Sequence, residues 1–561
     1  MPTPNAHATE MELLVGKEVF ELLSDENFLA SWSDLYHTCS WSTPYQSKEY
    51  VCSWYQLYGE NYLPIIVKTQ KEGKLTGLLT LALPSNQAKR GKKKIVAAGH
   101  FDADYQTWLA READGEAFIQ AAILALWKRF PKHDVALKYI PTQTPLSWIK
   151  STSFWEQRCT LVSFTRPLMD LKEADVSKRT KKRINQIKKL ATFERLTDFE
   201  RFSTLLDGQI GHLYDFRRGA LFNKNPFRDD PSNKQLLLSL FSKGILHVTV
   251  LKVHEEIIAS VAVMLGKDRA FLGGINCHSP LYADYSPGYL HFILLGQQLA
   301  VEGFDLFDLT PGYDPYKERL ATNHEEVHQL VITKSRRSYV KSRIGKWVHN
   351  RLIRTGIRPM SMQVEMKKRL YLLRHHGWYA MLSGKIKSLA QKDQQKLYIL
   401  DSRLTNPTAS IVIRKNSLGD LLSFEQQNKK LTRWEFLATA MRRFEQGEHC
   451  YTWTEDSRLL GCAWLAGTTA LLQDTGEGGI ASGVCLNGIY CHSAGKDKIT
   501  SFLKATITAV TADRDEEHIY VLATDVSLYE PLEAIGFRDL GKKALPSMEF
   551  SFYRPLASNQ G

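Results

Sequence analysis

Three consecutive residues, Ser286, Pro287 and Gly288, open a segment in which apolar side chains recur at helical spacing. The first turn of a helix leaves backbone N–H groups without partners, and the helix dipole places partial positive charge there. Such a helix end suits a phosphate or an oxyanion. Ser286 can cap the helix, Pro287 suits its first turn, and Gly288 lets a ligand approach the backbone. The same triplet also makes a good helix start without any ligand.

Groups for proton transfer follow this segment. Asp308 ends an apolar run, and Tyr316 and Lys317 come shortly after it. A partly buried carboxylate can have a raised pKa and take a proton from an amine or hydroxyl nucleophile. Tyr316 can donate a proton to a leaving thiolate, and Lys317 can pair with a phosphate or with Asp308. Asp308 and Tyr316 also have purely structural explanations. Asp308 can be a carboxylate paired with Lys317 or Arg319, and Tyr316 can be a core tyrosine.

Positive charge is concentrated in two stretches. Residues 178–189 hold seven Lys or Arg and no acid, which favours a phosphate-bearing partner such as coenzyme A, an acyl carrier protein or tRNA. Residues 341–396 hold fourteen Lys or Arg against two acids, together with Trp347, Trp378 and Tyr379. We expect a basic helical connector there, either packed over its neighbours or attached to an anionic membrane.

The elements that must position these residues form three rounds of strands and helices, the pattern of mixed α/β domains. The first round fills about 150 residues, and the second starts near Ser163. In the second round we expect three antiparallel strands with turns at 254–256 and 266–268, a helix over 286–302, and strands at 304–312 and 325–335. The third round occupies 397–561, with strands that include 409–416 and 548–555.

Length and composition limit the class of protein. A chain of 561 residues with 43% hydrophobic and 24% charged residues indicates about three globular domains and excludes a mainly disordered chain. The sequence has neither a run of about 20 apolar residues nor a signal peptide at its start, so we expect a cytoplasmic protein, peripheral to the inner membrane if the connector binds lipid. The eight cysteines form no CxxC pair, and we expect no metal site.

Residues 282–321 resemble the signature of the CelD/BcsL-like acetyltransferase family of the GNAT superfamily. The motif comprises Ser-Pro-Gly at 286–288, Gly303, Asp305 and Asp308, followed by Gly312, Tyr316 and Lys317. The segment 41–54 is similar to the family's opening, and 177–190 resembles the basic helix that begins the second half in FemA/FemX-like transferases. In place of the family's Asp-Phe-x-Arg-Gly, the sequence reads Asp-Leu-Thr-Pro-Gly, so Pro311 replaces the arginine.

The resemblance implies a division of the chain and a set of site residues. It implies tandem GNAT-like modules with mixed, mostly antiparallel sheets flanked by helices: 1–162, 163–340 with the signature, a connector over 341–396, and a C-terminal GNAT-like domain over 397–561. In these terms Asp308, Tyr316 and Lys317 are catalytic. The cofactor-binding residues are Ser286, Pro287, Gly288 and Gly312. Asp102, Asp104 and Tyr105 are similar to a substrate-side Asp-Tyr element, although a loop turn explains them equally well.

The implied activity is acyl transfer from acetyl-CoA or another acyl-CoA to an amine or hydroxyl acceptor within a ternary complex. No covalent intermediate is needed, and the family suggests work in bacterial exopolysaccharide or cell-envelope synthesis. Two alternatives stay open. One is an aminoacyl-tRNA-dependent transferase of the FemX kind, which the basic helices favour. The other is a non-catalytic scaffold of a synthase complex.

Overall fold

The computed structural model describes residues 10–85, 94–172, 178–312, 314–356, 359–391, 396–400, 411–427, 431–467, 483–513 and 518–542. The chain divides into two compact units. Unit 1 comprises residues 1–211, 226–278 and 285–363, and unit 2 comprises 212–225, 279–284 and 364–561. No helix in the described ranges is long and apolar enough to cross a membrane.

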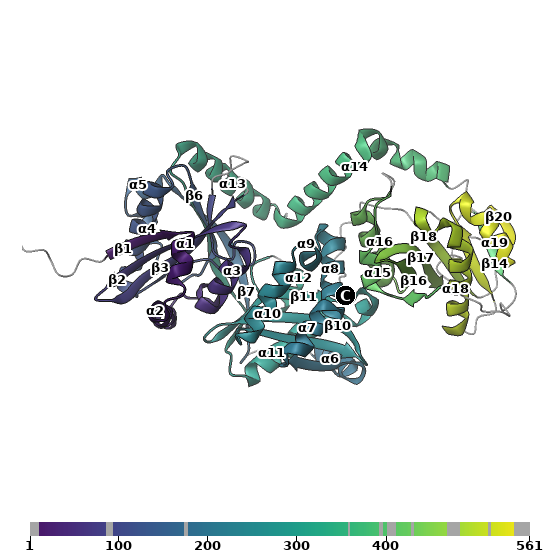
Figure 1. The fold of residues 1–561 in the computed structure, drawn as a ribbon, viewed down its shortest axis with the longest axis horizontal. Helices are drawn as coiled ribbons and strands as arrows, with labels where there is room; N and C mark the ends of the chain where they lie inside the picture. The colour runs from purple at the N-terminus through teal and green to yellow at the C-terminus, as the bar shows by residue number, and fades with distance from the viewer. Residues whose placement is uncertain are drawn as a thin grey trace, which may run out of the picture. The chain divides into compact units, whose positions relative to one another are not determined.

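Unit 1 is built around one sheet, which has thirteen strands in the described residues (Figure 1). Twelve of them follow the order β1-β2-β3-β4-β6-β13-β7-β12-β11-β10-β9-β8, and β5 pairs with β3. The strands are β1 (Glu10–Val15), β2 (Tyr62–Lys71), β3 (Lys74–Pro84), β4 (Lys94–Ala97), β5 (Leu109–Ala110), β6 (Asp134–Ile140), β7 (Cys159–Asp170), β8 (Thr192–Leu196), β9 (Leu246–Val253), β10 (Glu256–Leu265), β11 (Arg269–His278), β12 (Leu306–Asp308) and β13 (Asn323–Ile332).

Helices cover this sheet. The principal ones are α2 (Glu26–Thr38), α3 (Lys48–Tyr58), α4 (Gly115–Arg129), α6 (Lys178–Leu190), α7 (Phe199–Asp207), α10 (Pro231–Ser242), α11 (Pro287–Val301), α12 (Pro315–Leu320) and α13 (Arg336–Arg354). Helix α11 packs on β9, β10 and β11, and α4 packs on β1, β2 and β3. Ten residues of α11 are buried, from Pro287 to Leu299. An apolar surface all round the helix explains why it lies inside the fold.

One arrangement occurs three times along the chain. In the first copy β2, β3 and β4 are antiparallel, α4 crosses over, and β6 pairs parallel with β4. The second copy uses β9, β10 and β11, then α11, then β12 parallel to β11. The third copy uses β16 (His449–Glu455), β17 (Arg458–Gly467) and β18 (Val484–Cys491), then α18 (Ile499–Asp513), then β19 (Ile519–Ala523). The predicted mixed α/β fold with mostly antiparallel sheets is confirmed.

Unit 2 holds the third copy in a sheet of seven described strands, ordered β15-β16-β17-β18-β19-β14-β20. Its elements are β14 (Lys396–Leu400), β15 (Arg414–Lys415), α15 (Leu418–Leu422), α16 (Arg433–Glu445), β16 (His449–Glu455), β17 (Arg458–Gly467), β18 (Val484–Cys491), α18 (Ile499–Asp513), β19 (Ile519–Ala523), α19 (Tyr529–Ile535) and β20 (Arg538–Lys542). The residues 216–220 of α8 (Gln209–Phe222) join α15 and α16 in one hydrophobic cluster of this unit.

One expectation about strands needs correction. The segment 409–416 forms only the short β15 over its described residues. No strand was expected at 396–400, where β14 follows the basic connector. The connector itself contains α13 and α14 (Pro359–Gln391), and α14 is interrupted at Gly377, where φ is 76°. The strand expected at 548–555 lies outside the described residues.

Candidate active site

Strands β11 and β12 run side by side only briefly. Their parallel pairing begins at Arg269 with Leu306 and ends at Phe271 with Asp308. Strand β11 continues to His278, and its register against β10 shifts within this second part. Gly274 lies in the shifted part with φ of 76°, a left-handed conformation that favours glycine. Strand β11 therefore runs on past the end of β12 toward the start of α11.

The first turn of α11 is not capped by its serine. Ser286 takes the N-cap position with φ of 52° and ψ of 50°, and its side chain makes no capping hydrogen bond. A capping residue usually has extended backbone, so this left-handed conformation explains why the predicted cap is absent. Gly288 is buried, and a Cβ added there would lie 2.5 Å from Nδ1 of His278. A first turn whose N–H groups are not capped by Ser286 suits an anionic group.

Helix α12 lies against the first two turns of α11. The ring of Tyr316 lies 5.4 Å from that of Phe292, and the Arg319 guanidinium lies 5.2 Å from the Tyr289 ring. The amide of Asn276 on β11 donates a 3.1 Å hydrogen bond to the Tyr316 hydroxyl. A tyrosine hydroxyl that accepts one bond can still donate its own proton. The structure thus brings Tyr316 close to the helix start at 286–288.

Asp308 lies at the centre of a buried network. It has no exposed surface, and its Oδ1 accepts from the Tyr105 hydroxyl at 2.8 Å and from the Thr310 amide at 2.8 Å. Its Oδ2 accepts from Nη1 of Arg166 at 3.1 Å. Arg166 is itself buried and also pairs with Glu325. Asp308 therefore pairs with Arg166, and not with Lys317 or Arg319 as the purely structural explanation predicts.

Burial and the neighbouring charge of Arg166 shift the pKa of Asp308 in opposite directions. Burial raises the pKa of Asp308, whereas the Arg166 guanidinium and the two hydrogen bonds at Oδ1 favour its ionised form. Burial likewise raises the pKa of Tyr105 well above its usual range, and the nearby Asp308 adds to this effect. The raised pKa keeps the proton on Tyr105, whose hydroxyl donates to Oδ1 of Asp308.

Lys317 and Gly312 are neighbours in the segment that follows β12. The ammonium of Lys317 donates to the carbonyl of Thr310 at 3.1 Å and to its hydroxyl at 3.0 Å. It lies 3.8 Å from Asp314 Oδ2, and burial lowers the pKa of Lys317. A Cβ added at Gly312 would lie 3.3 Å from Nζ of Lys317. The predicted Gly312 and Lys317 are thus neighbours, and the lysine is held by the loop rather than by Asp308.

The three predicted substrate-side residues separate into different environments. Tyr105 belongs to the Asp308 network, while Asp104 pairs with Lys138 at 3.0 Å. Asp102 accepts from Trp54 Nε1 at 3.3 Å and from Asn233 Nδ2 at 3.4 Å. Burial raises the pKa of Asp102 to about 6. Only Tyr105 of the three is joined directly to a predicted catalytic residue.

Sequence reasoning missed Arg166, Asn276 and Tyr45. Arg166 is a cation inside an apolar strand, and this is a signal that the sequence offered. The hydroxyl of Tyr45 is buried without a hydrogen-bond partner in the described structure. A Cβ at Gly273 would lie 2.6 Å from this oxygen, so glycine is needed where Tyr45 meets β11. The Tyr45 hydroxyl therefore packs against the backbone of β11 at Gly273.

Over the described residues, no group of three or more His, Cys, Asp or Glu side chains is arranged to hold a metal ion. None of the eight cysteines forms a disulfide.

A family comparison assigns part of the chain. Residues 174–318 match the family described as an acetyltransferase (GNAT) domain. This range contains α6, the second copy of the repeated arrangement and most of the candidate site. The prediction of a GNAT-type acyltransferase is confirmed by this match. No protein with a curated description matches the sequence.

Solved structures similar to the chain include FemX, with 9% identity over 55% of this chain and 97% of that chain and a TM-score of 0.41. L-PGS from Bacillus licheniformis is 14% identical over 48% of this chain and 85% of that chain, with a TM-score of 0.35. A tandem GNAT protein from the clavulanic acid biosynthesis pathway is 10% identical over 57% of this chain and 98% of that chain, with a TM-score of 0.34.

Proposed function

We propose that the chain transfers an acyl group from acyl-CoA, with acetyl-CoA as the simplest donor, directly to an amine or hydroxyl acceptor. The observation that carries this proposal is the uncapped first turn of α11, which lies beside Tyr316 within the segment that matches the GNAT domain. Pyrophosphate oxygens of the donor would bind the N–H groups of this turn. The role of Ser286, Pro287 and Gly288 is thus to shape the backbone.

In the proposed reaction the acceptor attacks the thioester carbonyl, the new C–N or C–O bond forms, and the C–S bond breaks. The proton lost by the acceptor is balanced by the proton that the leaving thiolate takes up. Tyr316 is the proposed proton donor, because its phenolic group lies beside α11 and is oriented by the hydrogen bond that Asn276 donates to it. Holding both substrates in line supplies much of the rate acceleration.

We assign positioning roles to Asp308 and Lys317. Asp308 is enclosed by Tyr105, Arg166 and Thr310, so it orients these groups rather than reaching the acceptor. Lys317 holds the loop at Thr310 beside Gly312. Asp102 and Asp104 are proposed to lie on the acceptor side. From the resemblance to CelD/BcsL-like proteins we propose an acceptor in exopolysaccharide or cell-envelope synthesis.

A transfer assay tests this function. The full chain would be incubated with acetyl-CoA or a long-chain acyl-CoA and a panel of amine and hydroxyl acceptors, while free coenzyme A thiol is measured. Acceptor-dependent thiol release is expected, and Tyr316→Phe should lower it by about a hundredfold or more. The matched control is Tyr285→Phe, which changes an exposed tyrosine near the same helix start. Release that no acceptor stimulates contradicts the proposal.

Helix α6 favours a second candidate, an aminoacyl-tRNA-dependent transferase. A shallow hollow on its surface is lined by Lys178, Lys181, Lys182, Asn185, Gln186 and Lys189. The opposite side buries Ile184 and Ile187, so the lysines face outward together. Phosphate recognition by such a face, whether of tRNA, coenzyme A or an acyl carrier protein, weakens steeply with salt. Tight tRNA binding at low salt that α6 variants abolish supports this candidate, and no binding at low salt removes it.

A further inference from the structure

Helix α13 concentrates positive charge. It carries seven Lys or Arg and no Asp or Glu over its nineteen residues. The cations are Arg336, Arg337, Lys341, Arg343, Lys346, Arg351 and Arg354. Among the described residues, none of the seven forms an ion pair with a carboxylate, whereas many other cations of unit 1 do, such as Lys68 with Glu12. This charge is therefore not neutralised by described side chains of the fold.

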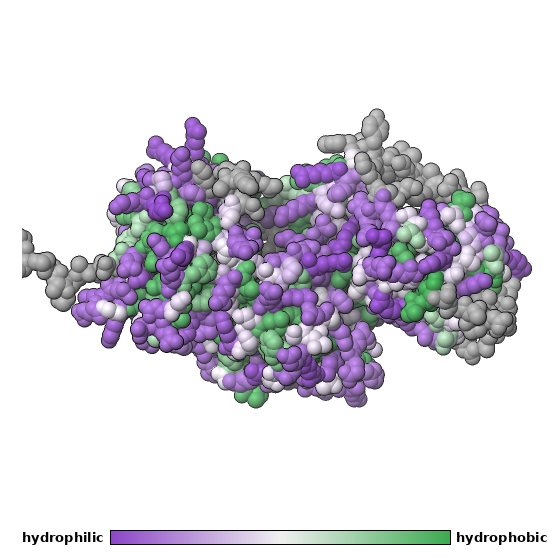
Figure 2. Space-filling model, viewed as in Figure 1, coloured by the Kyte–Doolittle hydropathy of each residue, from purple (hydrophilic) through white to green (hydrophobic). Residues whose placement is uncertain are grey.

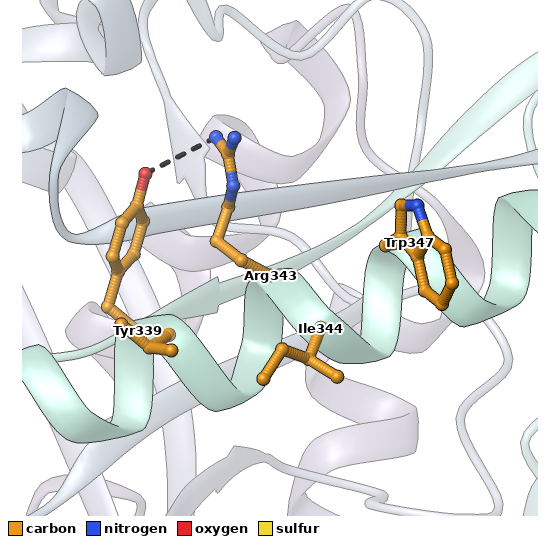
Figure 3. A pocket seen from close by; sticks show the side chains of 5 residues that line it. Tyr339, Arg343, Ile344 and Trp347 are labelled. Carbon is orange, nitrogen blue, oxygen red and sulfur yellow. Dashed lines mark hydrogen bonds between the residues drawn. The ribbon is translucent and has the colours of Figure 1, made fainter.

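The same helix exposes large apolar side chains. Val340, Ile344, Trp347 and Val348 are 53%, 58%, 62% and 40% exposed. Their spacing of four, three and one residues places them on one side of the helix. Figure 3 shows Ile344 and Trp347 on this stretch, with Arg343 reaching the hydroxyl of Tyr339. Most of the surface visible in Figure 2 is hydrophilic, so a continuous apolar stripe on one helix needs an explanation.

The helix is anchored by its other side. It packs on β7, where the ring of His349 lies 4.7 Å from that of Phe164. Leu352 and Ile353 are only half-exposed. The apolar stripe is thus presented outward by a helix that the fold already holds, and lipid would not be needed to form the helix.

The cations beside the apolar stripe indicate which kind of partner α13 binds. The Arg351 guanidinium lies 5.7 Å from the Trp347 ring, and Arg343 and Lys341 lie on neighbouring turns. Nucleic acid would use the cations and leave Val340, Ile344 and Val348 in water. The boundary of an anionic bilayer accommodates both groups, because its phosphates attract Lys and Arg while its acyl chains accept Trp and aliphatic side chains.

We propose that α13 binds the surface of an anionic membrane, with Val340, Ile344, Trp347 and Val348 inserted at the boundary of headgroups and acyl chains. Arg343, Arg351 and their neighbours would contact lipid phosphates. The helix lies in the plane of the surface and does not cross it. This binding site is separate from the acyl-transfer site and stands whether or not the proposed function is correct.

The test is co-sedimentation of the full chain with phosphatidylcholine vesicles, with and without phosphatidylglycerol, at low and high salt. Binding is expected only to the anionic vesicles, and it should weaken as salt rises. Ile344→Ser combined with Trp347→Ala should lower the partition constant by about tenfold or more, because apolar area is lost. The control is Val526→Ser, which removes another exposed aliphatic group and should leave binding unchanged.

A charge series completes the test. Lys341→Gln with Arg343→Gln should lower binding by about fivefold for each charge. The same number of charges removed from α6, by Lys178→Gln with Lys182→Gln, should have a smaller effect. Thermal melts show whether each variant is folded. The proposal is overturned if wild type does not bind anionic vesicles at low salt, or if the α13 variants bind like wild type. It is also overturned if these variants instead lose self-association or RNA binding and vesicle binding never occurs.

Discussion

Tyr105 and Asp308 lie 203 residues apart in the sequence, yet the Tyr105 hydroxyl donates a 2.8 Å hydrogen bond to Oδ1 of Asp308. Tyr105 precedes the crossover helix of the first repeated arrangement, and Asp308 ends the parallel strand of the second. Arg166 joins them, since its guanidinium binds Asp308 and lies 5.3 Å from the Tyr105 ring. The two arrangements of unit 1 are therefore held together at the candidate site.

Removal of the Tyr105 hydroxyl tests the strength of this connection. Tyr105→Phe should destabilise the protein by about 1–2 kcal/mol, because Asp308 keeps its bonds from Arg166 and Thr310 but loses one donor. Denaturant unfolding measures the loss. In Asp308→Asn the change to Phe should cost less, because a neutral acceptor makes a weaker bond. Equal costs in the two backgrounds would show that the hydroxyl does not act through Asp308.

Arg166 should matter more than Tyr105. Arg166→Met leaves a carboxylate buried without its cation, and such a change costs about 3–5 kcal/mol at neutral pH. The loss should shrink as the pH falls, because burial raises the pKa of Asp308 and protonation removes the unpaired charge. The double variant Arg166→Met with Asp308→Asn should lack this pH dependence. A loss that is the same at every pH contradicts the pairing.

His291 should make the fold sensitive to acid. It is fully buried on α11, its Nε2 lies 2.8 Å from Thr249 Oγ1, and burial lowers its pKa to about 3. Below a pH of about 6.5 the unfolded chain takes up a proton that the folded chain refuses, so stability falls with pH. His291→Gln should reduce this fall in thermal melts between neutral and acid pH. His324→Gln, at an exposed histidine, should not.

Asp102 should make the stability of the fold depend on pH in the opposite direction to His291. The pKa of Asp102 is raised to about 6 by burial, so its ionised form is disfavoured in the folded chain. Stability should therefore fall as the pH rises from about 4 to about 6, the window between the unfolded and folded values. Asp102→Asn removes this contribution, and its melting temperature should gain on wild type across the window. An equal gain from Asp34→Asn, at an exposed carboxyl group, would refute the assignment.

Local features of the fold could be predicted from the sequence. The two turns between β9, β10 and β11 and the span of α11 are fixed by short-range signals, and the structure confirms them. The order β6-β13-β7-β12 could not be predicted, because it depends on pairing between segments distant in sequence. The helical segment 199–222 is divided at Gly208 into α7 and α8, and a lone glycine does not reliably predict such a break.

The candidate site likewise has one part that could be predicted from local sequence and one part that could not. The helix start at 286–288 and the Tyr316–Lys317 pair could be chosen from local residue types, although their roles stay predictions. The Arg166–Asp308 pair could not be found by spacing, because the strands that carry these residues meet only in the folded sheet. Strand β14 was missed because this short segment joins the sheet only by pairing with β19 and β20, which are distant in sequence.

In the proposed reaction the first turn of α11 binds the phosphates of acyl-CoA. Calorimetric titration of the full chain with acetyl-CoA tests this binding, with Ser286→Asp beside Ser286→Asn. Asp and Asn both tolerate the left-handed backbone at this position, so the two variants differ mainly in one negative charge. We predict that Ser286→Asp weakens binding by about tenfold or more through repulsion of phosphate, while Ser286→Asn binds like wild type. Equal affinity in both variants, or no binding by wild type, would contradict the account.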